Sequence, residues 1–265
     1  MLFGGFLAQV AGRSIGLPRK AQGLLSYLAV HPGQAYLRDK LVSLFWGDVG
    51  REQGRHSLSQ TLFTLRKALP ATAASVLVVD GETIALDRHA VDVDVVNFER
   101  LLGEGTPRAL ADAAALYRGE LLEGFAVGEE AFEEWLRAQR LLLSELSVGA
   151  LTRLADHQVD AGATETAIQT ANRLVEFDPL REETHRTLMR LYSRQGRVGA
   201  ALKQYQTCVG LLRRDLGTEP EPATQTLYRQ ILPPAKGRSR HPRFTGCRAR
   251  REHSRRARPR WQVPR

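Results

Sequence analysis

The 265-residue chain has only two cysteines, Cys208 and Cys247, which lie far apart and form no CxxC pair or zinc-type Cys/His spacing. A disulfide scaffold and a zinc site are therefore excluded, and a reducing compartment is favoured. No hydrophobic run is long enough to cross a membrane. The apolar first residues lack the basic segment of a signal peptide. We therefore predict a soluble cytoplasmic, nucleoid-associated protein without a membrane partner.

Catalytic motifs are also missing. The chain contains neither a G-x-x-x-x-G-K-[ST] phosphate loop nor a G-x-S-x-G nucleophile elbow. A cluster of carboxylates at Glu129, Glu130, Glu133 and Glu134 has spacings that could hold a cation or support acid–base chemistry. However, no histidine lies near it, and acids are favoured by the dipole at the start of a helix. We predict a solvated helix start, no enzymatic activity, no cofactor and no metal.

The net charge of +9 is unevenly distributed. Residues 1–91 carry 10 Lys/Arg and 6 Asp/Glu, residues 92–232 carry 16 and 22, and residues 233–265 carry 12 and 1. The last segment has no hydrophobic period and is expected to be disordered. It either adds non-specific DNA affinity or is an out-of-frame or truncated end. These shifts predict three parts: a basic domain at 1–91, an acidic domain at 92–232 and a basic tail at 233–265.

The first part predicts short strands, three helices and a hairpin. Residues 2–17 contain β-type residues and glycines, with a turn at Gly12–Arg13. Helical spacing follows over 18–33, over 36–47 with a stripe through Leu37, Leu41, Leu44 and Phe45, and over 55–69. Trp46 ends the second stripe and is predicted to be core. The segment 76–87 then gives two strands joined at Asp80–Gly81. This order is typical of a winged helix-turn-helix.

The third helix has an unusual exposed face. Its leucines at 58, 62, 65 and 69 form the buried stripe, and the opposite side carries no acid after Glu52. In a winged helix this face would enter the major groove, where amides and hydroxyls bind base edges and an aromatic ring packs on thymine methyls. Basic side chains there, and one after the hairpin, would neutralise phosphates. The predicted DNA-binding residues are Arg55, His56, Ser59, Gln60, Phe63, Thr64, Arg66, Lys67 and Arg88.

Alternatives remain open for this face. The whole face could be an ordinary solvated surface of a small helical bundle. His56 could instead cap the start of the helix. Phe63 could pack under the wing or against a neighbouring protomer. The glycine-rich segment 47–53 is interpreted as a charged connector.

The second part is predicted to be wholly helical, with amphipathic runs near 94–103, 107–118, 129–157, 163–177, 181–195, 197–215 and 221–232. Comparison of the chain with itself at an offset of 34 residues reveals a repeat. The matched pairs are Leu154/Leu188, Gly162/Gly196, Ala167/Ala201, Ala171/Tyr205 and Val175/Val209. We therefore expect tetratricopeptide-like helical hairpins, whose stacks bind protein partners. The alternative is a coincidence of helix periods.

The two halves together resemble one family. The segments "LPRKAQGLLSYLAVHPG", "LRDKLVSLFWGD" and "SLSQTLFTLRKAL" are similar to the OmpR-type winged helix at the front of SARP-type regulators. The segments "VDVDVVNFERLL", "ALYRGELLEGF", "EEWLRAQRLLLSEL" and "ALKQYQTCVGLLRRDLGTEPEPATQTLYRQIL" resemble the bacterial transcriptional activator domain that follows it. The resemblance covers about residues 2–232, in the order that the family has. The arginine-rich residues 233–265 depart from it.

The resemblance implies a cofactor-free activator, often of secondary-metabolite (antibiotic) gene clusters. It implies binding to promoter direct repeats on double-stranded DNA, with protomers side by side as a homodimer, and recruitment of RNA polymerase holoenzyme. By position, Arg55, Ser59, Gln60, Thr64 and Lys67 fall on the recognition helix. Arg19 and Lys20 fall at the start of the first helix, where amides and cations can hold a phosphate.

One other class of protein fits the sequence. A helical-repeat scaffold or ligand sensor could carry the basic first domain merely as an interaction module. Sequence-specific binding of residues 1–91 to a duplex would distinguish the two, because a scaffold would not show it.

Overall fold

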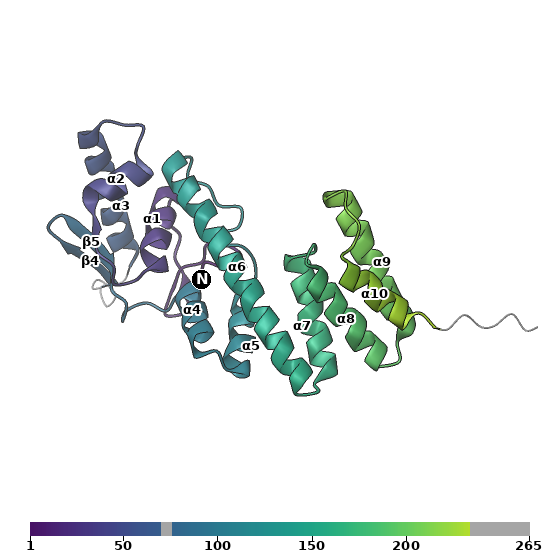
Figure 1. Cartoon of the computed structure of the whole chain (residues 1–265). Helices are drawn as coiled ribbons and strands as arrows, with labels where there is room; N and C mark the ends of the chain where they lie inside the picture. The colour runs from purple at the N-terminus through teal and green to yellow at the C-terminus, as the bar shows by residue number, and fades with distance from the viewer. Residues whose placement is uncertain (70–75, 234–265) are drawn as a thin grey trace, which may run out of the picture. The chain divides into compact units, whose positions relative to one another are not determined.

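The computed structural model describes residues 1–69 and 76–233. The predicted tail, apart from Pro233, lies outside the described residues. The fold is mostly helical, with ten helices and two small antiparallel sheets in the described part (Figure 1). This confirms the predicted class, a winged helix followed by helical repeats. No described helix combines the length and apolar character needed to span a bilayer.

The winged helix contains the predicted strands, helices and hairpin in the predicted order, together with one short strand that was not predicted. They are β1 (Gln9–Val10), β2 (Arg13–Ser14), α1 (Arg19–Val30), β3 (Tyr36–Leu37), α2 (Arg38–Phe45), α3 (Arg51–Ala68), β4 (Leu77–Asp80) and β5 (Thr83–Leu86). The three helices bury their apolar stripes against one another, with Leu24, Leu41 and Leu58 each fully buried. Trp46 is 8% exposed, which confirms that it belongs to the core.

One part of the second predicted helix is a strand. Tyr36 and Leu37 pair with Ile84 and Thr83, so β3 joins the hairpin in a sheet of order β3-β5-β4. Leu37 is 59% exposed, so the prediction that it belongs to the buried stripe of the second helix is wrong. It has extended backbone angles and precedes α2, whose apolar face begins at Leu41. Two residues are too few to show the alternation that marks a strand.

Helix α3 begins one turn earlier than the sequence suggested. It starts at Arg51, so Arg55 lies in its second turn rather than at its entrance. The helix crosses α2 closely at Gly54, where an added Cβ would lie 2.5 Å from Cγ1 of Val42. A glycine is therefore required at this crossing. The segment predicted as a charged connector, 47–53, includes the first residues of the helix.

The second half consists of seven helices in the described residues. They are α4 (Asp94–Glu104), α5 (Pro107–Leu116), α6 (Glu130–Asp160), α7 (Thr164–Phe177), α8 (Glu182–Arg194), α9 (Val198–Asp215) and α10 (Pro222–Ile231). The predicted repeat is visible in the backbone. Gly162 and Gly196 take the same left-handed conformation, with φ of +70° and +73°, between paired helices. Ala167 and Ala201 are both fully buried where those helices approach.

A single hydrophobic core crosses the predicted boundary at residue 91. It runs from Leu2 to Leu143 and includes the first half of α6. On α6, the ring of Phe132 lies 5.0 Å from that of Phe45 on α2. Trp135 lies 4.8 Å from Tyr27 on α1. The second half of α6 packs against α7. This one helix therefore belongs both to the winged-helix core and to the repeats.

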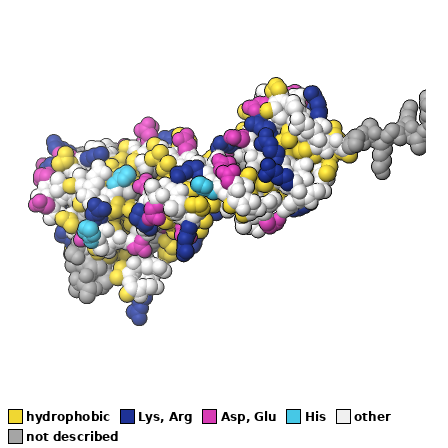
Figure 2. Space-filling model, turned by 60° about the horizontal axis from the view of Figure 1, so that its bottom comes forward, with side chains coloured by type: hydrophobic (Ala, Val, Ile, Leu, Met, Phe, Trp, Pro, Cys, Tyr) yellow, Lys and Arg dark blue, Asp and Glu magenta, His cyan; other side chains and the backbone are white. Residues whose placement is uncertain are grey.

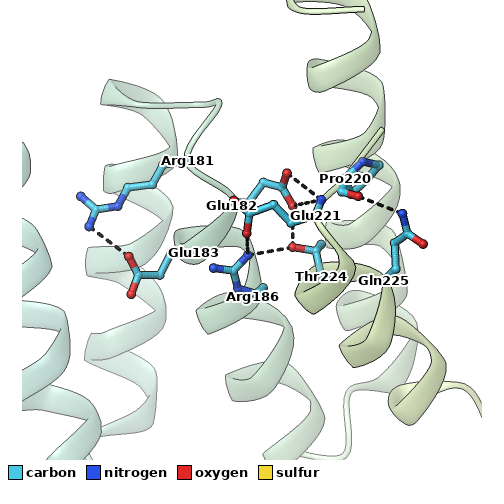
Figure 3. A network of polar contacts seen from close by, with 8 residues as sticks. All are labelled: Arg181, Glu182, Glu183, Arg186, Pro220, Glu221, Thr224 and Gln225. Atoms are coloured by element: carbon cyan, nitrogen blue, oxygen red, sulfur yellow. Dashed lines mark hydrogen bonds and ion pairs between the residues drawn. The ribbon is translucent and has the colours of Figure 1, made fainter. Parts of the chain in front are cut away.

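A polar network fastens the last helix to the repeats (Figure 3). The carboxylate of Glu182, at the start of α8, accepts hydrogen bonds from the backbone N–H of Glu221 at 2.9 Å and from Oγ1 of Thr224. Arg186 bridges to Glu221 at 2.7 Å and to Thr224 at 3.0 Å. Thr224 is fully buried. Because α10 buries few apolar side chains, these bonds help to fix it in place.

Candidate nucleic-acid interface

The predicted recognition face of α3 is solvent-exposed. Leu58, Leu62 and Leu65 are at most 3% exposed and hold the opposite side of the helix in the core. All of the predicted residues on α3 are exposed except Thr64, which is half-buried. Phe63 is 64% exposed, so it packs neither under the wing nor in the core of its own chain. This leaves an aromatic ring in the middle of a polar face.

The polar side chains of this face differ in the hydrogen-bond donors and acceptors that they have available for a base. The hydroxyl of Ser59 donates to the carbonyl of Arg55 at 3.0 Å, and that of Thr64 donates to the carbonyl of Gln60 at 2.9 Å. Their oxygens thus remain available as acceptors. Within the described residues, the amide of Gln60 and the imidazole of His56 make no hydrogen bond. The Gln60 amide can therefore present a donor and an acceptor together, as bidentate binding of adenine requires.

Arg55 is not a free cation. Its Nε donates to Oδ1 of Asp39, in the first turn of α2, at 2.9 Å, and its Nη2 lies 2.8 Å from the same oxygen. Its Nη2 also lies 3.7 Å from Oε2 of Glu82 in the turn of the wing. Arg51 pairs with the other oxygen of Asp39. Hydrogen bonds from Arg55 and Arg51 lower the pKa of the Asp39 carboxyl, and the Asp39 bond raises the pKa of Arg55.

Arg88, which was predicted to contact DNA from the wing, does not lie at the tip of the wing. Arg88 follows the end of β5, at the opposite end of that strand from the turn at Gly81 and Glu82. Its side chain lies near Gly33, after α1. The tip instead has Glu82 and the half-buried Arg38, whose Nε donates to the carbonyl of Gly81 at 3.2 Å. The DNA contact predicted for Arg88 stays a prediction, and this placement away from the tip does not favour it.

The basic pair at the start of α1, Arg19 and Lys20, makes contacts within the protein. Lys20 forms an ion pair with Glu129, donates to the carbonyl of Phe45 and lies 5.4 Å from the ring of Trp46. The guanidinium of Arg19 stacks over Phe125 at 4.9 Å. These contacts tie α1 to the segment before α6. A phosphate contact by Lys20 would require the ion pair to break, so that role stays a prediction which the geometry opposes.

Sequence reasoning missed two basic residues near the face. Arg51 was assigned to a connector, but it is the first residue of α3, and its side chain is 72% exposed. Arg38 was counted only as part of the second helix, but it links α2 to the wing turn. The available signal was Gly50, a residue that commonly precedes the first residue of a helix. Counting α3 from Gly50 would have placed Arg51 one turn before Arg55.

Charge alone does not locate the interface. Figure 2 shows basic and acidic side chains interspersed over the displayed face, with a column of Lys/Arg beside acids over the later helices. The acidic cluster at the start of α6 is used internally. Glu129 pairs with Lys20, and Glu133 accepts from the backbone N–H of Val127 at 2.7 Å. Only part of this cluster is therefore a solvated helix start.

The described residues contain no group of three or more His, Cys, Asp or Glu side chains arranged to hold a metal. A cavity of about 340 Å³ lies between the first residues, α1 and the wing, and it is lined mostly by apolar side chains such as Phe6, Leu25 and Val91.

The described residues thus form a winged helix joined through the shared helix α6 to tetratricopeptide-like repeats. Residues 93–232 match the bacterial transcriptional activator domain family. The chain therefore belongs to that family, which confirms the resemblance to SARP-type activators. The prediction that the chain is a regulator rather than an enzyme is confirmed by the same finding.

Two curated relatives agree with this assignment. Transcriptional regulatory protein MoaR1 of Mycobacterium tuberculosis is 25% identical over 228 residues, covering 82% of this chain and 73% of MoaR1. Transcriptional regulator RedD of Streptomyces coelicolor is 29% identical over 227 residues, covering 80% of this chain and 64% of RedD.

A solved structure shares the fold. Mycobacterium tuberculosis EmbR, in complex with a low-affinity phosphopeptide, superposes with a TM-score of 0.66 at 22% identity. The match covers 87% of this chain and 63% of the EmbR chain. The chain thus spans less than two thirds of both RedD and EmbR.

Proposed function

We propose that the protein is a sequence-specific DNA-binding transcriptional activator that acts in the cytoplasm at the nucleoid. In this proposal α3 enters the major groove, and the β4–β5 wing lies along the backbone. The observation that carries it is the exposed face of α3, which combines a free amide, acceptor oxygens, an exposed aromatic ring and cations, and has no acid after Glu52.

The base-reading set in this proposal is Ser59, Gln60, Phe63 and Thr64. Arg66 and Lys67 lie in the last turn of α3, are exposed and have no ion pair in the part of the chain that the structure describes. They serve as phosphate contacts. His56, also exposed, is a further candidate contact.

The repeat half supplies protein contacts in this proposal. Stacked helical hairpins present extended surfaces that suit protein partners. Protomers bind promoter direct repeats side by side, and the repeat half recruits RNA polymerase. The family membership and the relatives named as transcriptional regulators support an activator. In this proposal its targets are the genes of a secondary-metabolite cluster.

The test is fluorescence anisotropy with the full chain, duplexes from the promoters next to its gene, and a scrambled duplex, at several salt concentrations. Binding that prefers one promoter and persists near physiological salt is expected. Binding that ignores sequence and disappears with salt would reject the proposal. In that case the scaffold or ligand-sensor alternative would be favoured.

Two variants separate base reading from phosphate contact. Gln60→Ala is expected to cost about 1–3 kcal/mol on the preferred duplex and little on the scrambled one. Lys67→Ala is expected to weaken binding to both and to reduce the salt slope by about 1. The matched controls are Gln206→Ala and Lys203→Ala on α9, both at exposed positions. Equal effects of Gln60→Ala on both duplexes would contradict the assignment of the face.

A further inference from the structure

Asp39 of α2 forms ion pairs with Arg51 and Arg55 of α3, next to the exposed face of that helix. We propose that Asp39 is a positioning residue, which holds the Arg55 guanidinium along its Nε–Nη2 side and directs its Nη1–Nη2 end at a guanine in the major groove. This inference rests on the proposed function, and it specifies guanine as one base that the protein reads. It also changes the role predicted for Arg55 from phosphate contact to base contact.

The hydrogen-bond pattern defines the direction of the guanidinium. Nε and Nη2 of Arg55 both face Oδ1 of Asp39, at 2.9 and 2.8 Å. A guanidinium has five N–H donors in a rigid plane, and this contact uses those along one side. Within the described residues, Nη1 makes no hydrogen bond, and the second N–H of Nη2 has only Glu82 nearby, at 3.7 Å, so the donors along the end of the plane can meet a base. Two parallel donors at that end match O6 and N7 of guanine.

Asp39 is itself held in place. It lies in the first turn of α2, and its second oxygen pairs with Arg51, one turn before Arg55 on the same helix. Two arginines of α3 therefore fix a carboxylate of α2 from two directions. An arginine side chain that is held before binding loses less rotamer entropy when it meets a base.

The surrounding charge favours a base over a phosphate. Asp39 pairs with Arg55 directly, and Oε2 of Glu82 lies 3.7 Å from Nη2 of Arg55. The two carboxylates offset the charges of Arg51 and Arg55, so this cluster attracts an incoming phosphate less than an unpaired arginine would. The edge of a guanine is neutral and presents only acceptor dipoles. Arg55 is also the fifth residue of α3, and the first residues of a recognition helix contact base edges.

The experiment selects binding sites for the full chain from a pool of duplexes with a randomised core, followed by sequencing. Wild type is compared with Asp39→Ala, Asp39→Asn and Arg55→Ala. Asp48→Asn is the matched control, because Asp48 is exposed in the loop before α3 and has no ion pair within the described residues. Affinity for one fixed random-sequence duplex is measured for every variant. Thermal unfolding verifies that each variant is folded.

The proposal expects wild type to show a guanine preference that is lost in Arg55→Ala and, at the same position only, in Asp39→Ala. The loss should be roughly 10-fold, the size of one good bidentate contact. Asp39→Asn should weaken the same preference. The Asp39 variants should bind the random duplex at least as well as wild type, because a negative charge has been removed. Asp48→Asn should keep every preference.

Two results would overturn the proposal. One is an Asp39→Ala profile identical to that of wild type, with uniformly tighter binding to all duplexes, which would show that Asp39 only weakens a phosphate contact. The other is loss of different positions in Asp39→Ala and Arg55→Ala. If wild type enriches no sequence at all, the proposed function itself fails. Failure of the proposed function is therefore distinguishable from failure of the role of Asp39, in which wild type does enrich a sequence.

Discussion

The contact between α6 and the winged helix can be tested by removing one ring. Phe132 is fully buried, and its centroid lies 5.0 Å from Phe45, 5.3 Å from Trp135 and 6.2 Å from Phe125. Truncating a buried phenylalanine to alanine costs about 3–5 kcal/mol. These neighbours belong to α2, to α6 and to the segment before it, so they cannot all move to fill the space. We expect Phe132→Ala to cost about 4–5 kcal/mol, near the top of that range.

The assay is urea unfolding followed by tryptophan emission and by far-UV circular dichroism. In a Trp261→Phe background the remaining tryptophans, Trp46 and Trp135, both belong to this core, so their emission reports on the junction, whereas dichroism reports on all helices. The thermal midpoint should also fall, by roughly 2–4 °C per kcal/mol for a chain of this size. The matched control is Leu141→Ala on the same helix, because Leu141 is 64% exposed. It should change stability by less than about 0.5 kcal/mol.

A cost below about 1 kcal/mol for Phe132→Ala would refute the reasoning, because burial of this ring would then contribute little to stability. A cost equal to that of Leu141→Ala would do the same. Either outcome would mean that α6 does not complete the winged-helix core.

Three further predictions follow from burial. A fragment 1–91 should lack a cooperative unfolding transition because it omits the part of the core on α6, whereas a fragment extended to the end of α6 should show one by calorimetry. Burial lowers the pKa of His185 below its ordinary 6.5, so the unfolded chain binds more protons, and the free energy of unfolding should fall as pH drops below that value. In urea titrations this loss should be smaller in His185→Gln and unchanged in His157→Gln, at an exposed position. Burial also raises the pKa of Cys208 to about 11, so in a Cys247→Ser background its thiol should react with a thiol reagent only after unfolding.

Most of the fold could be predicted because its signals are local. The leucines of α3 recur at 58, 62 and 65 with helical spacing, and the hairpin has a two-residue turn between apolar runs. The repeat was visible because Gly162 and Gly196 must take the same left-handed conformation at the same point of each unit. These features depend on residues close together in sequence, so periodicity and turn chemistry are sufficient to detect them.

The candidate site was less predictable because its geometry depends on pairs distant in sequence. Arg55 could be placed on the exposed face from spacing alone, but its partner Asp39 lies sixteen residues earlier on another helix. Lys20 is a similar case, since Glu129 is more than a hundred residues away. A charge that looks available in the sequence can be paired in the fold. Only the three-dimensional arrangement separates Arg55 and Lys20 from cations such as Lys67, which has no ion pair with any residue that the structure describes.

The boundary at residue 91 illustrates the same limit. Composition changes there from basic to acidic, which marks a change in surface charge. The core does not follow that change, because Tyr27 and Phe45 are covered by Trp135 and Phe132 from beyond it. Surface composition and core packing are independent properties, so a charge shift need not mark a folding boundary. In this chain the winged helix is complete only with α6. Because the same helix packs on α7, the winged-helix core and the repeats share one continuous helix.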